Sequence, residues 1–147
     1  MVSKVDRKAI RRWRRRGFYS EKVLVKLLEK HGYNAVRVPI SNPSRNPLPD
    51  VIARRNQHVY AFEVKNAKLY AYFPREQIEK LFKFLDKFIP SSREFKHAIL
   101  AAHLGKKWIF NEIPWDRWVN GTLPEYERIM KKENGNFKIE DGKSMSV

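Results

Sequence analysis

One segment constrains the fold of this chain more than any other. Residues 58–65 read HVYAFEVK, an apolar run that contains one acid and one lysine. A strand this apolar is predicted to be central in its sheet, with both faces covered. Because side chains alternate along a strand, Glu63 and Lys65 are expected on one face and Tyr60 on the other. Acids and lysines are rare in such strands, since burial of an unpaired charge is costly.

The flanking segments predict a mixed α/β architecture. We expect helices over residues 17–32, 74–89, 114–118 and 123–132, and strands over residues 33–39, 48–54, 58–65, 97–103 and 107–110. This order is typical of one layered domain with a sheet at its centre. The predicted fold class is therefore α/β, with a central mixed five-stranded sheet flanked by helices.

The helix expected over residues 74–89 is apolar on more than one side. Its core stripe comprises Ile78, Leu81, Phe82, Leu85 and Phe88. Phe84 and Ile89 lie outside that stripe. The helix is then either buried on two sides or covered by a second subunit, and we expect the second arrangement, because a small domain has little else to cover it.

The strong positive charge of the chain indicates a polyanionic partner. Its 147 residues fit a single domain, 1–147, and contain 31 Lys and Arg against 16 Asp and Glu, a net charge of +15. Nucleic acid is the usual partner of such a domain, and an anionic membrane surface is the alternative. We expect a basic leader at residues 1–16, which grips phosphate or is simply solvated, and a mobile tail at residues 134–147.

The residue types that are absent narrow the chemistry further. The chain contains no cysteine, which excludes disulfides, thiolate zinc sites and a cysteine nucleophile. No apolar run is long enough to span a bilayer, and the N-terminus is too charged for a secretory signal. These features favour an intracellular, cytoplasmic protein without a membrane partner.

Asp50, Glu63 and Lys65 are the residues expected to carry chemistry. Asp50 begins one predicted strand, and the other two share a face of its neighbour. Two carboxylates at one site repel each other unless a divalent cation lies between them, and oxygen ligands suit magnesium or manganese. Such a site can activate water for phosphodiester hydrolysis, with Lys65 orienting the water and stabilising the developing charge. Glu21, near the start of the first helix, either completes the metal shell or complements the helix dipole.

Five segments together resemble a known family. They are residues 15–21, 32–42, 46–53, 62–65 and 75–77, which read RRGFYSE, GYNAVRVPISN, NPLPDVIA, FEVK and REQ. In this order and at these spacings they are similar to the archaeal-type Holliday junction resolvases of the PD-(D/E)xK nuclease superfamily. The Ser41-Asn42 pair most resembles the paralogue called Holliday junction endonuclease, and an archaeon or a virus of an archaeon is the expected source.

The resemblance implies a restriction-endonuclease-like fold, a homodimer and symmetric nicking of four-way DNA junctions with Mg²⁺, for which Mn²⁺ can substitute. It implies that Glu21, Asp50 and Glu63 bind the metal and that Lys65 is catalytic. It also makes Ser41 a functional loop residue near the junction. The residues implied for DNA contact or support of the site are Arg15, Arg16, Arg37, Arg75 and Gln77.

Two features depart from the family pattern. The basic leader is longer than usual, and the segment after Asn111, with Trp115 and Trp118, has no clear counterpart. These departures leave two alternatives open. One is another DNA repair or restriction nuclease on the same fold, and the other is a non-catalytic junction-binding protein.

Overall fold

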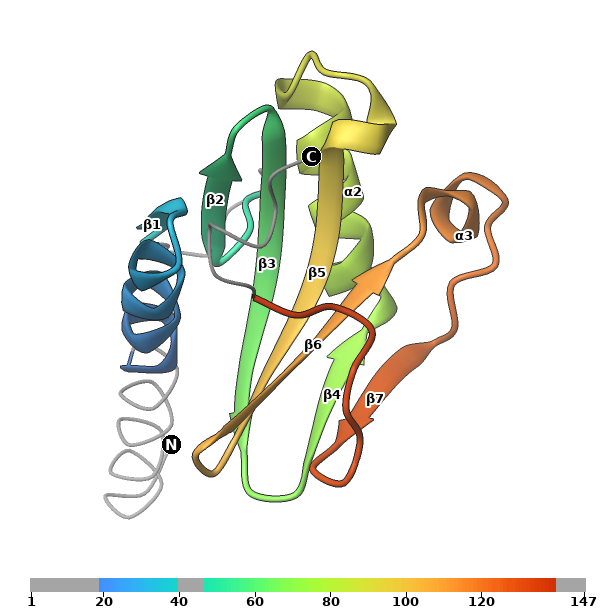
Figure 1. Cartoon of the computed structure of the whole chain (residues 1–147). Coiled ribbons are helices and arrows are strands. Elements are labelled where there is room, and N and C mark those ends of the chain that lie inside the picture. Colours follow the sequence, from blue (N-terminus) through green and yellow to red (C-terminus); the bar gives the residue numbers. More distant parts are fainter. Residues whose placement is uncertain (1–18, 40–46, 140–147) are drawn as a thin grey trace, which may run out of the picture.

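The computed structural model describes residues 19–39 and 47–139. The centre of the fold is a five-stranded sheet in the order β1–β2–β3–β5–β6 (Figure 1). These strands span Asn34–Arg37, Val51–Arg55, His58–Ala67, Lys96–Leu104 and Lys107–Ile113. β3 and β5 are parallel, whereas the other neighbours are antiparallel. The structure confirms the predicted mixed sheet.

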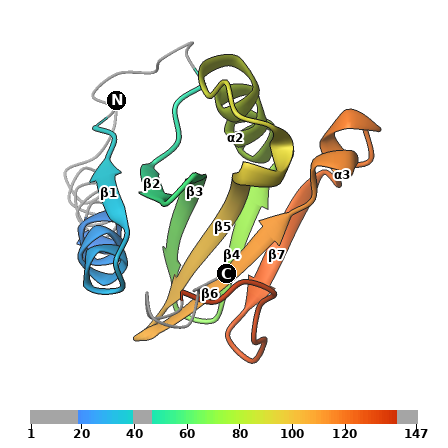
Figure 2. The same ribbon diagram turned by 45° about the horizontal axis from the view of Figure 1, so that its top comes forward.

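β3 is the central strand, as its apolar sequence predicts. On one face of the sheet, Phe62 packs in a core with Leu24 and Leu28 of the first helix, which is described over residues 19–30. On the other face, Ala61 belongs to the core beneath α2, Arg75–Phe88. Figure 2 shows the first helix and α2 on different sides of the strands. By alternation, the acid and the lysine of β3 lie on the α2 side.

The apolar stripe of α2 is confirmed for four of its five predicted members. Ile78, Leu81, Phe82 and Leu85 are fully buried. The placement of Phe88 in that stripe is wrong, because its side chain is 56% exposed. Phe88 lies about 80° around the helix from Ile78, but Phe84 lies further round and is buried, so the angle alone does not account for the exposure of Phe88, which is the last residue of α2. Phe84 is buried instead, and its ring contacts that of Phe88 at 5.8 Å.

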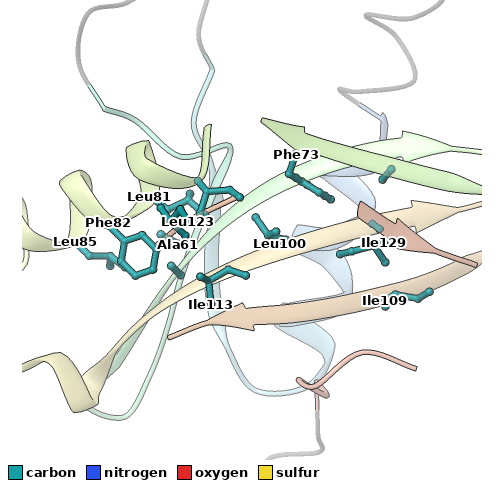
Figure 3. Packing of buried hydrophobic residues seen from close by; sticks show 14 of the residues in the cluster. Ala61, Phe73, Leu81, Phe82, Leu85, Leu100, Ile109, Ile113, Leu123 and Ile129 are labelled. Atoms are coloured by element: carbon teal, nitrogen blue, oxygen red, sulfur yellow. The ribbon is translucent and has the colours of Figure 1, made fainter. Parts of the chain in front are cut away.

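A second, two-stranded sheet was absent from the sequence-based expectations. β4, Tyr70–Pro74, pairs antiparallel with β7, Tyr126–Met130. The helix predicted over residues 123–132 is therefore wrong there, because pairing with a distant strand overrides the local pattern. The inner face of this small sheet buries Phe73 and Ile129 in the core that α2 covers (Figure 3).

The short helix predicted near Trp115 is confirmed as α3, Trp115–Val119. The rings of Trp115 and Trp118 lie 5.0 and 5.6 Å from that of Phe82, so α3 is fixed to α2 by aromatic packing. The 3₁₀ helix η1, Arg93–Phe95, precedes β5.

Near the end of the described chain, the backbone N–H of Phe137 donates to the carbonyl of Phe110 at 3.1 Å. This bond holds the first part of the predicted tail against β6. The predicted leader and residues 140–147 lie outside the described residues. Among the described helices, none combines the length and the apolar character needed to cross a membrane.

Candidate active site

The register of the β2–β3 ladder brings Asp50 beside Glu63. The ladder ends with Val51 opposite Phe62, so the next position places Asp50 across from Glu63. The backbone N–H of Asp50 donates to the carbonyl of Phe62 at 3.0 Å. The carboxylate oxygen Oδ2 of Asp50 accepts a hydrogen bond of 2.9 Å from the backbone N–H of Val64. These bonds fix the Asp50 carboxylate against the middle of β3.

Glu63 is a buried acid with an unusual environment. Its side chain is 5% exposed, and its Oε2 accepts no hydrogen bond from the described residues. Burial raises the pKa of Glu63 to about 8, and the negative charge of Asp50 adds to that rise. Lys80 Nζ lies 3.9 Å from this oxygen, beyond hydrogen-bond reach. A buried carboxylate oxygen without a donor is a natural position for a cation.

Lys65 follows two positions later on the same face of β3 and is half-buried. Its positive charge lowers the pKa of Glu63, which shows that the two groups interact electrostatically. Neither a hydrogen bond nor an ion pair engages its ammonium group within residues 19–39 and 47–139. The Lys65 ammonium can therefore reach a bound anion without first breaking a contact to those residues.

Glu21 approaches the pair from the first helix but is held by Arg37 of β1. Arg37 Nε donates to Glu21 Oε2 at 2.7 Å, and both side chains are largely buried. Burial raises the pKa of Glu21, the hydrogen bond from Arg37 lowers it, and the charge of Asp50 raises it again. Arg37, predicted for DNA contact or support of the site, thus acts on a carboxylate of the site in this structure.

Asp50 and Glu63 fit a divalent cation. They supply two hard oxygen ligands in close proximity, and one of those oxygens has no donor. In the part of the chain that the structure describes, no group of three His, Asp or Glu residues is arranged to hold a metal. The fit therefore rests on this pair, and the role of Glu21 as a third ligand stays a prediction.

The residues predicted to contact DNA are only partly described. Arg75, at the start of α2, donates from Nε to the carbonyl of Pro124 at 3.1 Å and is otherwise exposed. Gln77 is half-buried, and its Oε1 has no hydrogen-bond partner among the described residues. Both residues open the helix that covers the face of Glu63. Arg15, Arg16 and Ser41 lie outside the described residues, so their roles stay predictions.

Comparison with known proteins identifies the family of this chain. The family model described as archaeal Holliday junction resolvase (Hjc) matches residues 12–146. The chain belongs to this family. The crossover junction endodeoxyribonuclease of Sulfolobus islandicus rod-shaped virus 1 is 42% identical over 76 residues, which is 51% of this chain and 63% of the viral protein. The crossover junction endodeoxyribonuclease Hje of Sulfolobus acidocaldarius is 37% identical over 100 residues, 66% of this chain and 69% of that protein.

The fold of this chain is also similar to that of a solved archaeal Holliday junction resolvase. Hjc of Archaeoglobus fulgidus, described as a Holliday junction resolvase from an archaeal hyperthermophile, matches with a TM-score of 0.59 and 26% identity. The match covers 78% of this chain and 88% of the solved chain. It confirms the predicted resemblance and fold class.

The sequence analysis missed a partly buried polar network beside the site, formed by Ser20, Asn66 and His103. Asn66 Nδ2 donates to Ser20 Oγ at 2.6 Å, and Ser20 Oγ lies 2.9 Å from His103 Nδ1. Burial lowers the pKa of His103, which favours a neutral ring. Ser20 precedes Glu21, and Asn66 follows Lys65, so this network ties the first helix to β3. Nothing in local spacing predicts it, because 83 positions separate Ser20 from His103.

Lys80 of α2 is a second residue beside the site that the sequence analysis did not single out. Its ammonium group lies on the Glu63 side, with Nζ 3.9 Å from the Oε2 atom of Glu63. Its charge lowers the pKa of Glu63 against the larger effects of burial and of Asp50. Lys80 therefore contributes positive charge to the site from the helix above β3.

Proposed function

We propose that this member of the archaeal Holliday junction resolvase family is an endonuclease that resolves four-way DNA junctions by metal-dependent hydrolysis of phosphodiester bonds. The observation that carries the proposal is the Asp50–Glu63 pair. Glu63 is buried, its Oε2 atom accepts no hydrogen bond from the described residues, and its carboxyl group faces the carboxylate of Asp50. The names of the relatives support the substrate, and the net charge of +15 supports a polyanionic partner.

The residues of the site have distinct roles in this proposal. A Mg²⁺ ion, or Mn²⁺ in its place, would supply a water of lowered pKa and polarise the scissile phosphate. Asp50 and Glu63 would hold the ion, and Glu21 would complete its shell directly or through water. Lys65 orients the attacking water and stabilises the negative charge that develops on the phosphate.

The remaining residues of the proposed interface act on the DNA. Arg15, Arg16 and Arg75 would contact phosphates, which supply affinity without reading sequence. Arg37 and Gln77 would support the site or reach the DNA beside it. Ser41 would act in the loop that approaches the junction. Recognition of this kind depends on junction shape more than on base contacts.

A homodimer is part of the proposal. A two-fold axis relates two active sites and therefore two nicks on opposing strands. The exposed ring of Phe88, 56% accessible, and the partly buried Ile89 at the end of α2 support a contact surface for the second copy. Because its substrate is cellular or viral DNA, the proposed enzyme acts inside the cell.

The test is cleavage of a synthetic four-way junction beside a linear duplex of matched sequence, with Mg²⁺, Mn²⁺ or a chelator. We expect symmetric nicks in the junction alone, and only with metal. The Glu63→Gln variant should bind the junction without nicking it. Equal cutting of the duplex would indicate a different nuclease on this fold. Junction binding without cleavage under any of these metals would indicate a non-catalytic junction-binding protein.

A further inference from the structure

The outward face of the β4–β7 sheet carries three exposed tyrosines. The ladder pairs Tyr72 with Arg128, Tyr70 with Met130 and Pro74 with Tyr126, and paired side chains lie on one face of a sheet. Tyr70, Tyr72 and Tyr126 are 47, 48 and 53% exposed. The opposite face of the same strands is buried in the core. These three residues, termed the tyrosine face, therefore point away from the core.

The rings of the tyrosine face lie close enough to act together. The centroids of Tyr70 and Tyr72 are 6.2 Å apart, and those of Tyr72 and Tyr126 are 5.5 Å apart. Aromatic rings presented on a sheet surface are a recurring way to bind unpaired nucleobases, because every base offers a flat face for stacking. Paired bases inside a duplex do not offer that face.

Positive charge accompanies these rings. Arg128 is exposed on the same face, directly opposite Tyr72. Beyond the end of β7, Lys131 and Lys132 line an open pocket of about 440 Å³ together with Leu69, Tyr70 and Met130. The acid within β7, Glu127, is on the other side of the strand and pairs with Arg117 at 3.5 Å. The surface is thus complementary to the phosphates of a nucleic-acid strand.

We infer that the tyrosine face binds unpaired DNA, with bases stacked on Tyr72 and its neighbours and phosphates held by Arg128 and Lys132. The inference goes beyond the proposed nuclease activity, because it rests on residues other than Asp50, Glu63 and Lys65. It assigns to the chain a second DNA-binding surface. This surface distinguishes single-stranded segments, such as tails or gaps beside a junction, from fully paired arms.

The test compares single-stranded and duplex DNA of equal length by fluorescence anisotropy, in chelator so that no cleavage occurs. Tyr72→Leu should weaken binding of a thymidine oligonucleotide by about tenfold or more and leave duplex binding unchanged, because leucine lacks a stacking ring. Tyr72→Phe should preserve binding of that oligonucleotide, since its ring remains. Arg128→Gln should weaken binding and reduce its dependence on salt. Val119→Ser, on an exposed position of α3, is the matched control and should change neither affinity.

Two results would overturn the inference. One is a Tyr72→Leu variant that binds the oligonucleotide as well as the parent chain or loses duplex binding equally. The other is a change in oligomeric state of this variant by light scattering, which would assign the face to a second copy. Unfolding is excluded by circular dichroism. Glu63→Gln should retain oligonucleotide binding, because Glu63 is not part of the tyrosine face. If the parent chain cuts no junction, the proposed nuclease activity is contradicted, whereas the oligonucleotide-binding measurements still test the tyrosine face by themselves.

Discussion

The carboxylate of Asp50 faces that of Glu63 where β2 begins beside the middle of β3. Each backbone is fixed by the ladder, so the two acids cannot separate without loss of strand pairing. Burial and this proximity raise the pKa of Glu63 to about 8. A divalent cation between the acids relieves their repulsion, which links the strand register directly to metal binding.

Removal of either acid should abolish junction nicking while the fold persists. For Asp50→Asn and Glu63→Gln we expect nicking to fall by at least about 100-fold, because each change removes a charged ligand. Junction binding in chelator should remain, and isothermal titration with Mn²⁺ should show weakened metal binding. Glu112→Gln, on the opposite face of the sheet, serves as the control. Full activity of Glu63→Gln would contradict the site.

The stability of the metal-free protein should depend on pH through Glu63. Its pKa is about 8 when folded and near its ordinary value of 4.5 when unfolded, so the folded state retains a proton that the unfolded state releases. The stabilisation that Glu63 contributes to the folded state is fully present below about pH 4.5 and is lost as the pH rises to about 8. Glu63→Gln removes this pH dependence. The melting temperature of the variant should therefore increase relative to that of the parent chain as the pH rises. A difference that is constant from about pH 5 to about pH 8 would contradict this assignment.

Lys65 should affect the rate more than the binding of metal or junction. Lys65→Met keeps the length of the side chain but removes the charge that would stabilise the phosphate in the transition state. We expect kcat for junction nicking to fall by about 100- to 1000-fold, with the metal midpoint and the junction Kd little changed. Single-turnover cleavage at saturating enzyme measures this. A large shift in the metal midpoint with an unchanged rate at saturation would instead make Lys65 a support for the metal site.

Helix α3 should contribute stability through its contacts with Phe82. That side chain is fully buried and contacts Trp115 and Trp118. Phe82→Ala should lower the free energy of unfolding by about 3–5 kcal/mol, measured by urea denaturation followed through tryptophan fluorescence. Val119→Ala on the exposed side of α3 should change it by less than about 0.5 kcal/mol. Similar losses in both variants would contradict this packing.

Local pattern predicted the parts of the site that lie close together along the chain. Glu63 and Lys65 share a face because strand side chains alternate, and the structure places them so. The sequence also predicted that the strand begun by Asp50 neighbours the strand of Glu63 and Lys65, and the pairing of β2 with β3 confirms this. It did not predict that Arg37 pairs with Glu21, because that contact depends on where the first helix lies against β1.

The β4–β7 sheet could not be predicted from local sequence pattern. Residues 126–130, YERIM, were expected to lie in a helix, yet they pair with residues 70–74. Pairing over such a separation is set by burial of Phe73 and Ile129 in a shared core, which no local window contains. The prediction for Phe88 failed for a related reason, because the width of the buried stripe depends on what α2 packs against.

The central strand, the acid and lysine on one face of it, the strong positive charge and the family resemblance could all be predicted from the order of the residues. These follow from side-chain alternation and composition, which are local properties. Three other features emerge only in the folded protein: the raised pKa of Glu63, the hydrogen bond from Arg37 to Glu21 and the tyrosine face. Each of these depends on burial or distance between segments far apart in the chain, and those quantities exist only once the chain has folded.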